Sequence, residues 1–442
     1  MEKRPITFGT DGARGIANEG LLPEDALRLG LAAARLFGGP IMIGRDTRLS
    51  GGMLSSALCA GAASGGARMI DAGVLPTPGV AALAPTLGAA AAGVVSASHN
   101  PYPDNGIKFF CGEGWKLDAA KEREIESLTR DADHVRPTGG GVGAVERLDD
   151  AAGLYVEGLL GRLRPRAGGM KVLLDCANGA AYEAAPMAFE ELGVDLTIVG
   201  NEPSGTNINE GRGSTHVRSL DASGHDVAFA FDGDADRVLA KDERGRVVAG
   251  DEIIAILARD LKERWALEGG VVVTVMSNLG FFKAMDARGI TYEVTPVGDR
   301  HVAEAMRRRR ASLGGEQSGH VIISEYVTTG DGIVTALALL DVMARSDKSL
   351  SELAEVMEVY PQELINVTVA DAASAKALAA SEAVERAVLE AEERLGEEGR
   401  ILLRPSGTEP VVRVMVEHTD EAVCREVCEE VARVVGEAGV RE

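Results

Sequence analysis

The sequence predicts an α/β protein of several domains, and three observations lead to this prediction. Short runs of β-branched apolar residues alternate with alanine- and leucine-rich helical stretches along most of the chain. Glycine-containing turns separate these segments, as in α/β folds with mixed or largely parallel sheets. The chain has 442 residues, more than one ordinary core holds. We therefore expect roughly two to four domains.

The expected elements follow one another in a regular order. The predicted strands are short apolar runs at residues 40–44, 91–95, 171–175, 226–231, 270–275, 364–369 and 411–416. The predicted helices are longer stretches at residues 24–37, 150–163, 251–264 and 372–398, with a last one from Glu421. The helix over 372–398 is expected to be exposed, and the tail around it to form a small α+β domain.

One uncharged stretch needs its own explanation. Between Asp71 and His99 the chain carries no Asp, Glu, Lys or Arg, as a membrane-spanning helix would. Pro76, Pro78 and Pro85 interrupt it, so a strand, turn, helix and strand through a buried core explain it better. Because the N-terminus also lacks the apolar segment of a signal peptide, we expect a cytoplasmic protein.

Changes of composition suggest three domain boundaries. A glycine-rich loop at 138–141 precedes the predicted helix at 150–163, and a charged turn at 243–250 precedes the helix at 251–264. The run Val359-Tyr360-Pro361-Gln362 precedes the strand at 364–369. The expected domains are residues 1–150, 151–250, 251–363 and 364–442.

The charge balance limits the possible partners. The formal net charge is −22 at pH 7, and long-range repulsion then disfavours both nucleic acid and anionic membranes. A phosphorylated small molecule can still bind, provided that its site is locally basic or rich in backbone N–H groups. The five cysteines are scattered without a CxxC pair, so we expect buried thiols and no disulfide framework.

A serine-containing loop follows the predicted strand at 91–95. Ser96-Ala97-Ser98-His99-Asn100-Pro101 has small residues that allow a sharp turn and expose a hydroxyl group, with Lys108 ten residues after Ser98. A serine hydroxyl becomes a nucleophile only with help from a base or a metal ion. An ordinary polar turn is the alternative interpretation.

An acidic loop follows the predicted strand at 226–231. In Asp232-Gly233-Asp234-Ala235-Asp236-Arg237 three carboxylates stand at alternate positions and would repel one another without a cation. Ligands that are all oxygen favour Mg²⁺. An EF-hand spaces its acids in the same way, but its sixth position is Gly, whereas Arg237 stands here. A solvated acidic turn is the other alternative.

Two further loops offer groups for a sugar phosphate. Gly315-Glu316-Gln317-Ser318-Gly319-His320 presents a carboxylate and a hydroxyl that suit sugar hydroxyls or an amine. Arg404-Pro405-Ser406-Gly407-Thr408-Glu409-Pro410, with Arg413 beyond it, combines guanidinium, hydroxyl and backbone N–H groups that suit a phosphate. Either loop alone is also compatible with a polar turn, but the four loops together contain every part of a phosphoryl-transfer site.

With the segment Phe8-Gly9-Thr10-Asp11-Gly12-Ala13-Arg14-Gly15, these loops resemble the α-D-phosphohexomutases over essentially the whole chain. The resemblance implies three related α/β domains with mixed sheets and a smaller C-terminal α+β domain around a central cleft. In chain order, it implies a phosphoserine-bearing, a metal-binding, a sugar-binding and a phosphate-binding domain.

The resemblance also implies roles for single residues. Ser98 would carry the phosphoryl group, and Ser98 with Asp232, Asp234 and Asp236 would hold Mg²⁺. The further catalytic residues implied are Lys108 as general acid and base, Arg14, His99 and, as an additional candidate, Arg45. To accept the hydroxyl proton Lys108 needs a lowered pKa, and we expect the neighbouring Arg14 to lower it. The substrate-binding residues implied are Arg237, Glu316, Ser318, Arg404, Ser406, Gly407, Thr408 and Arg413.

The activity implied is an isomerase reaction that interconverts glucosamine 6-phosphate and glucosamine 1-phosphate through a 1,6-bisphosphate. It would feed synthesis of UDP-N-acetylglucosamine and cell-wall precursors, with hexosamine or glucose 1,6-bisphosphate as activator. Gln317 and Gly298-Asp299-Arg300 favour glucosamine, and glucose or mannose phosphates are the alternative with the same mechanism. A metal-dependent phosphatase and an inactive sugar-phosphate binder are the alternative functions of another class. For the oligomeric state, the sequence is compatible with a homodimer.

Two residues depart from the family pattern. Ala235 replaces a common Gly, which we expect to be tolerated if φ at this position is negative. Pro405 removes one N–H donor from the phosphate loop, which leaves the detailed phosphate contacts open.

Overall fold

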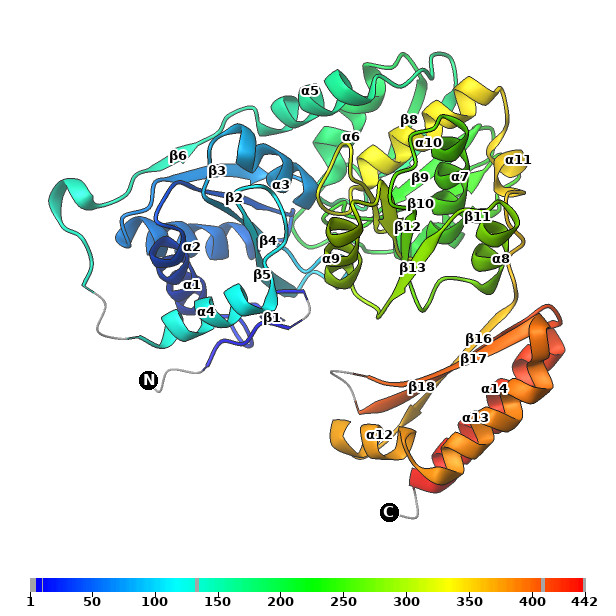
Figure 1. Cartoon of the computed structure of the whole chain (residues 1–442). Coiled ribbons are helices and arrows are strands. Elements are labelled where there is room, and N and C mark those ends of the chain that lie inside the picture. The colour runs from blue at the N-terminus through cyan, green and yellow to red at the C-terminus, as the bar shows by residue number, and fades with distance from the viewer. Residues whose placement is uncertain (1–4, 10, 132–134, 407–409, 440–442) are drawn as a thin grey trace. The chain divides into compact units, whose positions relative to one another are not determined.

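The computed structural model describes residues 5–9, 11–131, 135–406 and 410–439. The chain divides into two compact units. The first unit comprises Met1–Met276 and Gly289–Val356, and the second comprises Ser277–Arg288 and Met357–Glu442. Figure 1 follows the elements in chain order, from blue at the N-terminus to red at the C-terminus.

The N-terminal sheet of the first unit has six strands in the order β1-β5-β4-β2-β3-β6. Its strands are β1 (Ala13–Ile16), β2 (Ile41–Arg45), β3 (Met69–Val74), β4 (Ala91–Val95), β5 (Asp104–Cys111) and β6 (Val145–Arg147). β2 pairs in parallel with β3 and β4, whereas β5 runs antiparallel to β4 and β1. The sheet is therefore mixed, as the sequence predicted.

Helices cover this sheet, and their ends follow from the sequence. They are α1 (Pro23–Phe37), α2 (Gly51–Ser64), α3 (Thr77–Thr86) and α4 (Ala119–Arg130). α1, α2 and α4 share one buried apolar cluster with the sheet. α1 begins at Pro23 and ends before Gly38, which has a φ of 64°. Gly30 and Gly61 bring α1 and α2 together, because a Cβ at either would lie 2.0 Å from a backbone oxygen of the other helix.

The uncharged stretch after Asp71 passes through this core. It forms the end of β3, all of α3 and all of β4, which confirms the predicted strand, helix and strand. Every residue of β4 is buried. Among the residues that the structure describes, none of the helices is both long and apolar enough to cross a bilayer.

Two more mixed sheets complete the first unit, in the orders β11-β10-β9-β7-β8 and β13-β12-β14-β15. Their strands are β7 (Lys171–Asp175), β8 (Asp195–Val199), β9 (Val227–Phe231), β10 (Val238–Asp242), β11 (Val247–Val248), β12 (Val271–Thr274), β13 (Tyr292–Thr295), β14 (Leu313–Gly315) and β15 (Val321–Ile323). Their helices are α5 (Ala151–Leu163), α6 (Ala181–Glu190), α7 (Gly250–Glu263), α9 (Asp299–Arg309), α10 (Gly332–Ser346) and α11 (Leu350–Ala354). The charged segment at 243–250 is more than a turn, because β11 within it pairs with β10.

The second unit is built on an antiparallel sheet in the order β16-β18-β17. Its elements are α8 (Leu279–Ala287), β16 (Gln362–Thr368), α12 (Ala372–Ala379), α13 (Glu382–Leu395), β17 (Gly399–Pro405), β18 (Val411–His418) and α14 (Glu421–Gly439). The prediction of one exposed helix over 372–398 is wrong. The chain turns at Ala380 and Ser381, and α12 and α13 each bury apolar residues in the cluster shared with α14.

Candidate active site

The loop after β4, residues 96–101, is called the serine loop; Ser96, Ala97 and Ser98 are buried, and the rest is half-buried or exposed. Ser98 is 1% exposed and has a φ of 51°, in the left-handed region that residues other than glycine rarely adopt. Its Oγ donates a hydrogen bond of 2.6 Å to Asp232 Oδ2. Folding therefore brings this hydroxyl to the acidic loop of the second sheet.

That acidic loop, residues 232–237 after β9, is called the aspartate loop. One oxygen from each of Asp232, Asp234 and Asp236 lies within 4.8 Å of the others, and all three residues are buried. Within the described part of the chain, Asp234 Oδ1 and Asp236 Oδ1 are buried without a hydrogen-bond partner. Buried carboxylate oxygens without partners are costly, and a cation would satisfy them. The three hard oxygen donors fit Mg²⁺.

The three carboxylates do not titrate alike. Burial and the charges of Asp236 and Asp234 raise the pKa of Asp232 well above its usual range. Burial also raises the pKa of Asp236, but a hydrogen bond from His320 and the charge of Lys108 outweigh burial and hold it below its ordinary value. Like charges in one buried site force such an uneven division of protons.

Lys108 lies on β5 beside these carboxylates, with Nζ 2.7 Å from Asp234 Oδ2 and 3.8 Å from Asp236 Oδ2. Burial lowers the pKa of the ammonium group, but Asp234, Asp11 and Asp236 raise it more, and the net change is upward. The expected lowering by Arg14 is therefore wrong. The guanidinium of Arg14 pairs with Asp11, a carboxylate that itself favours the charged form of Lys108.

His99 connects the two loops from the other side. Its Nδ1 lies 3.3 Å from Ser98 Oγ and 3.3 Å from Arg237 Nη1. Burial lowers the pKa of His99, and the charges of Arg237 and Arg14 lower it further. The neutral imidazole that results can accept a hydrogen bond from Arg237. Arg45, the additional candidate, lies with Nη1 3.8 Å from Asp71 Oδ1.

The loop between β14 and β15 carries the residues predicted to bind the sugar. Glu316 Oε1 accepts a hydrogen bond of 3.0 Å from the backbone N–H of Gly298. Ser318 Oγ is buried and has no hydrogen-bond partner among the residues described. His320, to which the sequence pattern assigned no role, lies with Nδ1 3.6 Å from Asp236 Oδ2 and accepts from Gly330 N at 3.1 Å. The imidazole therefore joins this loop to the aspartate loop.

Two residues beside the site carry no motif of their own. Thr77 Oγ1 donates to Asp234 Oδ2 at 2.6 Å, and the backbone N–H of Thr77 donates to Asp234 O at 2.9 Å. Lys116 Nζ lies 3.0 Å from Asp11 Oδ1 and 2.6 Å from Asp299 Oδ2. Only the position of Thr77, just after the end of β3 and at the start of α3, could have pointed to it from sequence.

Ala235 of the aspartate loop has a left-handed backbone. Its φ is 58°, so the negative φ on which tolerance of alanine depended is not met, and the residue is fully buried. Its carbonyl accepts a hydrogen bond of 3.0 Å from Gly332 N. A left-handed conformation costs a non-glycine residue roughly 1 kcal/mol, so the surrounding contacts must hold the turn in place.

The predicted phosphate-binding residues lie in the second unit. Arg404 on β17 and Arg413 on β18 are direct cross-strand partners. Burial and the charge of Arg413 lower the pKa of the Arg404 guanidinium. Two cations that face each other in this way favour an anion between them. Ser406 is buried, and Gly407 and Thr408 lie outside the described residues.

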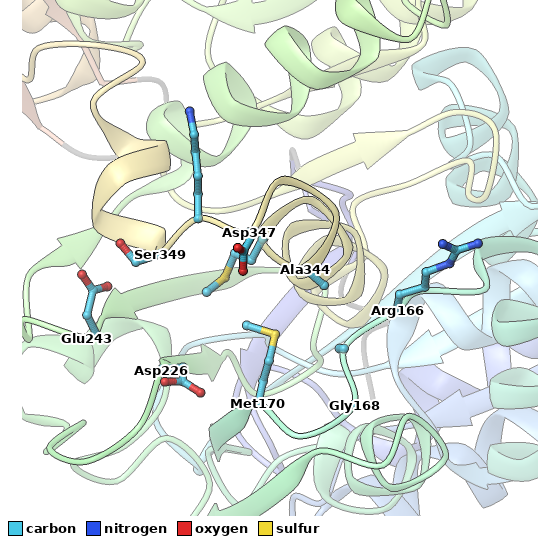
Figure 2. A pocket seen from close by; sticks show the side chains of 11 residues that line it. Arg166, Gly168, Met170, Asp226, Glu243, Ala344, Asp347 and Ser349 are labelled. Carbon is cyan, nitrogen blue, oxygen red and sulfur yellow. The ribbon is translucent and has the colours of Figure 1, made fainter.

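A separate pocket of about 490 Å³ lies in the first unit. Its lining includes Arg166, Met170, Asp226, Glu243, Asp347 and Ser349. Figure 2 shows Met170 between Arg166 on one side and Glu243 on the other. None of the lining residues belongs to the serine, aspartate, sugar or phosphate loops, so this pocket is not part of the site described above.

Four family models match the chain in sequence order. They are the Phosphoglucomutase/phosphomannomutase alpha/beta/alpha domain I over residues 5–136, domain II over 154–245, domain III over 249–360 and the C-terminal domain over 364–434. Together they span nearly the whole chain.

Individual proteins match the chain just as extensively. A phosphoglucosamine mutase from Rubrobacter xylanophilus is 71% identical over 438 residues, which cover 99% of each chain. The structure of a phosphoglucomutase/phosphomannomutase family protein from Burkholderia thailandensis has a TM-score of 0.81 at 25% identity, covering 98% of this chain and 97% of that one. An Aspergillus fumigatus N-acetylphosphoglucosamine mutase, solved with GlcNAc-6P and magnesium, shares the fold with a TM-score of 0.71 at 18% identity, covering 99% and 96%. The chain belongs to the phosphoglucosamine mutase family of phosphohexomutases, and it is an enzyme of the isomerase class.

Proposed function

We propose that the chain interconverts glucosamine 6-phosphate and glucosamine 1-phosphate by means of a phosphoryl group carried on Ser98. The observation that carries the proposal is the 2.6 Å hydrogen bond from Ser98 Oγ to Asp232 Oδ2, at a cluster of three buried carboxylates. The relative that shares 71% of its residues with this chain supports glucosamine as the sugar.

In the proposed cycle, the bond between phosphorus and Ser98 Oγ breaks as a bond to the free hydroxyl of the sugar phosphate forms. The hydroxyl proton passes to a base, and the sugar becomes a 1,6-bisphosphate. After the bisphosphate has turned around, its other phosphoryl group returns to Ser98, and the product leaves with phosphate at the other carbon. Added hexosamine or glucose 1,6-bisphosphate would restore phosphate to a serine that had lost it.

The residues around the serine receive the following proposed roles. Asp232, Asp234 and Asp236 with Ser98 would hold Mg²⁺, which offsets charge on the oxygens of a transferring phosphoryl group. Lys108, in contact with Asp234, is proposed as the general acid and base, in line with the family resemblance. Because the neighbouring carboxylates favour its ammonium form, it can accept the hydroxyl proton only after it has lost one of its own. The remaining catalytic residues proposed are Arg14, near the reacting phosphate, and His99. Arg237, a substrate-binding residue, is proposed to orient the transferring phosphoryl group.

Binding of the substrate involves two further groups of residues. Glu316 and Ser318 are proposed to bind the sugar, and the unpartnered hydroxyl of Ser318 supports this role. The residues proposed to hold the second phosphate are Arg404, Ser406, Gly407, Thr408 and Arg413, a role that the facing arginines of β17 and β18 support. The cytoplasmic location and the homodimer stay predictions from the sequence.

The test starts with the protein incubated with glucose 1,6-bisphosphate and Mg²⁺. Intact-mass measurement should find one phosphoryl group, which peptide mapping places on Ser98. Ser98→Ala should lose the modification and all measurable turnover of glucosamine 6-phosphate while its circular dichroism is unchanged. Ser351→Ala is the matched control, because it also removes a buried hydroxyl, one that donates to Glu243 far from the serine loop in sequence.

Three results would contradict the proposal. Turnover in Ser98→Ala would show that the reaction does not need a phosphoserine at this residue. A higher kcat/KM for glucose or mannose 6-phosphate would change the substrate. Release of inorganic phosphate without isomerisation would indicate a phosphatase.

A further inference from the structure

The proposed reaction uses the hydroxyl of Ser98 but leaves a buried arginine behind it without a role. The side chain of Arg48 is 0% exposed and is paired through Nε with Asp46 Oδ2 at 2.8 Å. Its Nη2 donates to the carbonyl oxygens of Ser98 and Asn100, both at 2.8 Å. Its Nη1 donates to the carbonyl of Pro101. One guanidinium group therefore bonds three carbonyls of the serine loop.

A second side chain, that of Asn209, donates to two of the same three carbonyls. Asn209 lies between β8 and β9, and its Nδ2 donates to Ser98 O at 2.9 Å and to Asn100 O at 3.1 Å. The backbone N–H of Asn209 is itself bonded to Ala177 O at 2.9 Å, which fixes its position. The carbonyl of Ser98 thus receives one donor from the loop after β2 and one from the connection between β8 and β9.

These contacts have a reason in the backbone of Ser98. At a φ of 51° the residue turns its carbonyl inward, where it would be buried without a partner if these donors were absent. The N–H of Ser98 is also bonded, to Ser96 Oγ at 2.9 Å. Gly233 of the aspartate loop lies so close that a Cβ there would be 2.5 Å from Ser98 O. The direction in which the Ser98 hydroxyl points therefore depends on the hydrogen bonds that the Ser98 carbonyl accepts.

We propose that Arg48 and Asn209 are positioning residues that hold Ser98 in its left-handed conformation, so that its hydroxyl faces the aspartate loop. Neither touches the reacting atoms. Because Asn209 lies in the connection between β8 and β9, and the aspartate loop follows β9, it also fixes the serine loop relative to the aspartates. The inference rests on the proposed function of Ser98 for its effect on turnover, but its effect on the loop can be measured separately.

The decisive comparison is between Asn209→Ala and Asn209→Asp. Alanine removes both hydrogen bonds, and kcat should fall about 10-fold with KM changed less than about threefold. Aspartate keeps the volume but sets a carboxylate against two carbonyl oxygens, so kcat should fall about 100-fold. A side chain that only filled space would give the opposite order. The rate at which bisphosphate labels Ser98, followed by intact mass, should fall by the same factors.

Hydrogen exchange provides a readout that does not need turnover. Amides of a peptide covering residues 96–101 should exchange about 10-fold faster in Asn209→Ala, because the loop opens locally more often. Asn278 of the second unit is the control, since its Nδ2 also donates two bonds, to Tyr360 O and to Glu417. Asn278→Ala should leave both kcat and exchange of the serine loop unchanged.

Arg48→Lys keeps the charge beside Asp46 but cannot bond three carbonyls, and it should lose more turnover than Asn209→Ala. If this variant does not fold, the Asn209 pair decides the question. Equal kcat in Asn209→Asp and wild type, a milder loss with aspartate than with alanine, or unchanged exchange of the loop would each overturn the inference. Failure of the proposed function would appear differently, as wild-type protein that bisphosphate does not label.

Discussion

The serine loop and the aspartate loop share one backbone feature and differ in how their polar groups are satisfied. Each follows a buried strand of five residues and contains a non-glycine residue in the left-handed region, Ser98 at 51° and Ala235 at 58°. In the serine loop the N–H, carbonyl and hydroxyl of Ser98 are all bonded. In the aspartate loop several backbone carbonyls accept hydrogen bonds, but Asp234 Oδ1 and Asp236 Oδ1 have no hydrogen-bond partner within the described residues.

This difference separates two tasks of the site. The polar groups of Ser98 are all hydrogen-bonded within the protein, so its hydroxyl is held in position without a ligand. The aspartate loop keeps like charges together in a buried place, which a folded protein tolerates where a cation is to bind. The backbone of the serine loop should therefore keep its conformation with or without Mg²⁺, whereas the carboxylates of the aspartate loop should depend strongly on the ion.

The largest expected effect comes from reducing the charge of the aspartate loop. Asp234→Asn keeps the shape of the side chain but removes one negative charge and weakens the contact with Lys108. Turnover at saturating sugar phosphate should fall roughly 10³-fold or more, and calorimetry should show weaker Mg²⁺ binding. Asp260→Asn, at a buried acid that pairs with Arg345, is the control and should keep its turnover. A loss of turnover smaller than tenfold in Asp234→Asn would contradict a catalytic metal ion in the aspartate loop.

The second effect concerns stability. If the unpartnered oxygens bind Mg²⁺, the ion should stabilise the folded first unit by about 2.7 kcal/mol at 100 times its dissociation constant. Thermal unfolding with and without Mg²⁺ would show the shift, and a chelator would reverse it. Asp234→Asn should unfold at nearly the same temperature in both conditions. Identical unfolding curves of the wild-type protein with and without Mg²⁺ would show that the aspartate loop does not bind the ion.

The third effect uses a buried acid of the same unit whose oxygens do have partners. Asp331 accepts from Tyr155 Oη at 2.6 Å and from Val334 N at 3.0 Å, yet burial raises its pKa to about 6 from an ordinary 3.8. The folded state therefore binds this proton more tightly than the unfolded state. Its contribution to stability is complete below about pH 4 and is lost as pH rises to about 6.

Asp331→Asn removes this titration, and its single side-chain oxygen can still accept from Val334 N at the cap of α10, while its Nδ2 can donate to Tyr155 Oη. The stability of the variant relative to wild type should rise between pH 4 and pH 7, by up to roughly 3 kcal/mol. Urea unfolding at several pH values measures this. Mg²⁺ should leave the difference unchanged, unlike its effect at Asp234. Parallel pH profiles for the two proteins would contradict the raised pKa.

What the sequence predicts well is what lies in one short segment. The strand before each loop and the composition of each loop are contiguous, so β4, β7 and the serine and aspartate loops could be placed from the sequence alone. Arg48, Asn209 and Thr77 could not be assigned, because each acts on a loop that is remote in sequence. The break between α12 and α13 depends on the core that both helices share with α14.

Properties that a residue acquires from its neighbours in the fold could not be predicted from the sequence either. The net upward change in the pKa of Lys108 comes from three carboxylates that only the fold assembles around it. The φ of Ala235 follows from the turn that directs three carboxylates inward. The family pattern suggested glycine at this position, and the structure shows why glycine would suit it.

The smallest expected effect tests that last point. Ala235→Gly relieves a backbone strain of about 1 kcal/mol, but it also removes a fully buried methyl group worth about 0.8 kcal/mol and makes the unfolded chain more flexible. The terms nearly cancel, so the free energy of unfolding should change by less than about 1 kcal/mol and turnover should persist. Ala235→Val should instead destabilise clearly, because a β-branched residue fits poorly at a φ of 58°. Urea unfolding of both variants distinguishes a strained turn from an ordinary one: if valine were tolerated as well as glycine, the left-handed backbone would not be the constraint that the two loops share.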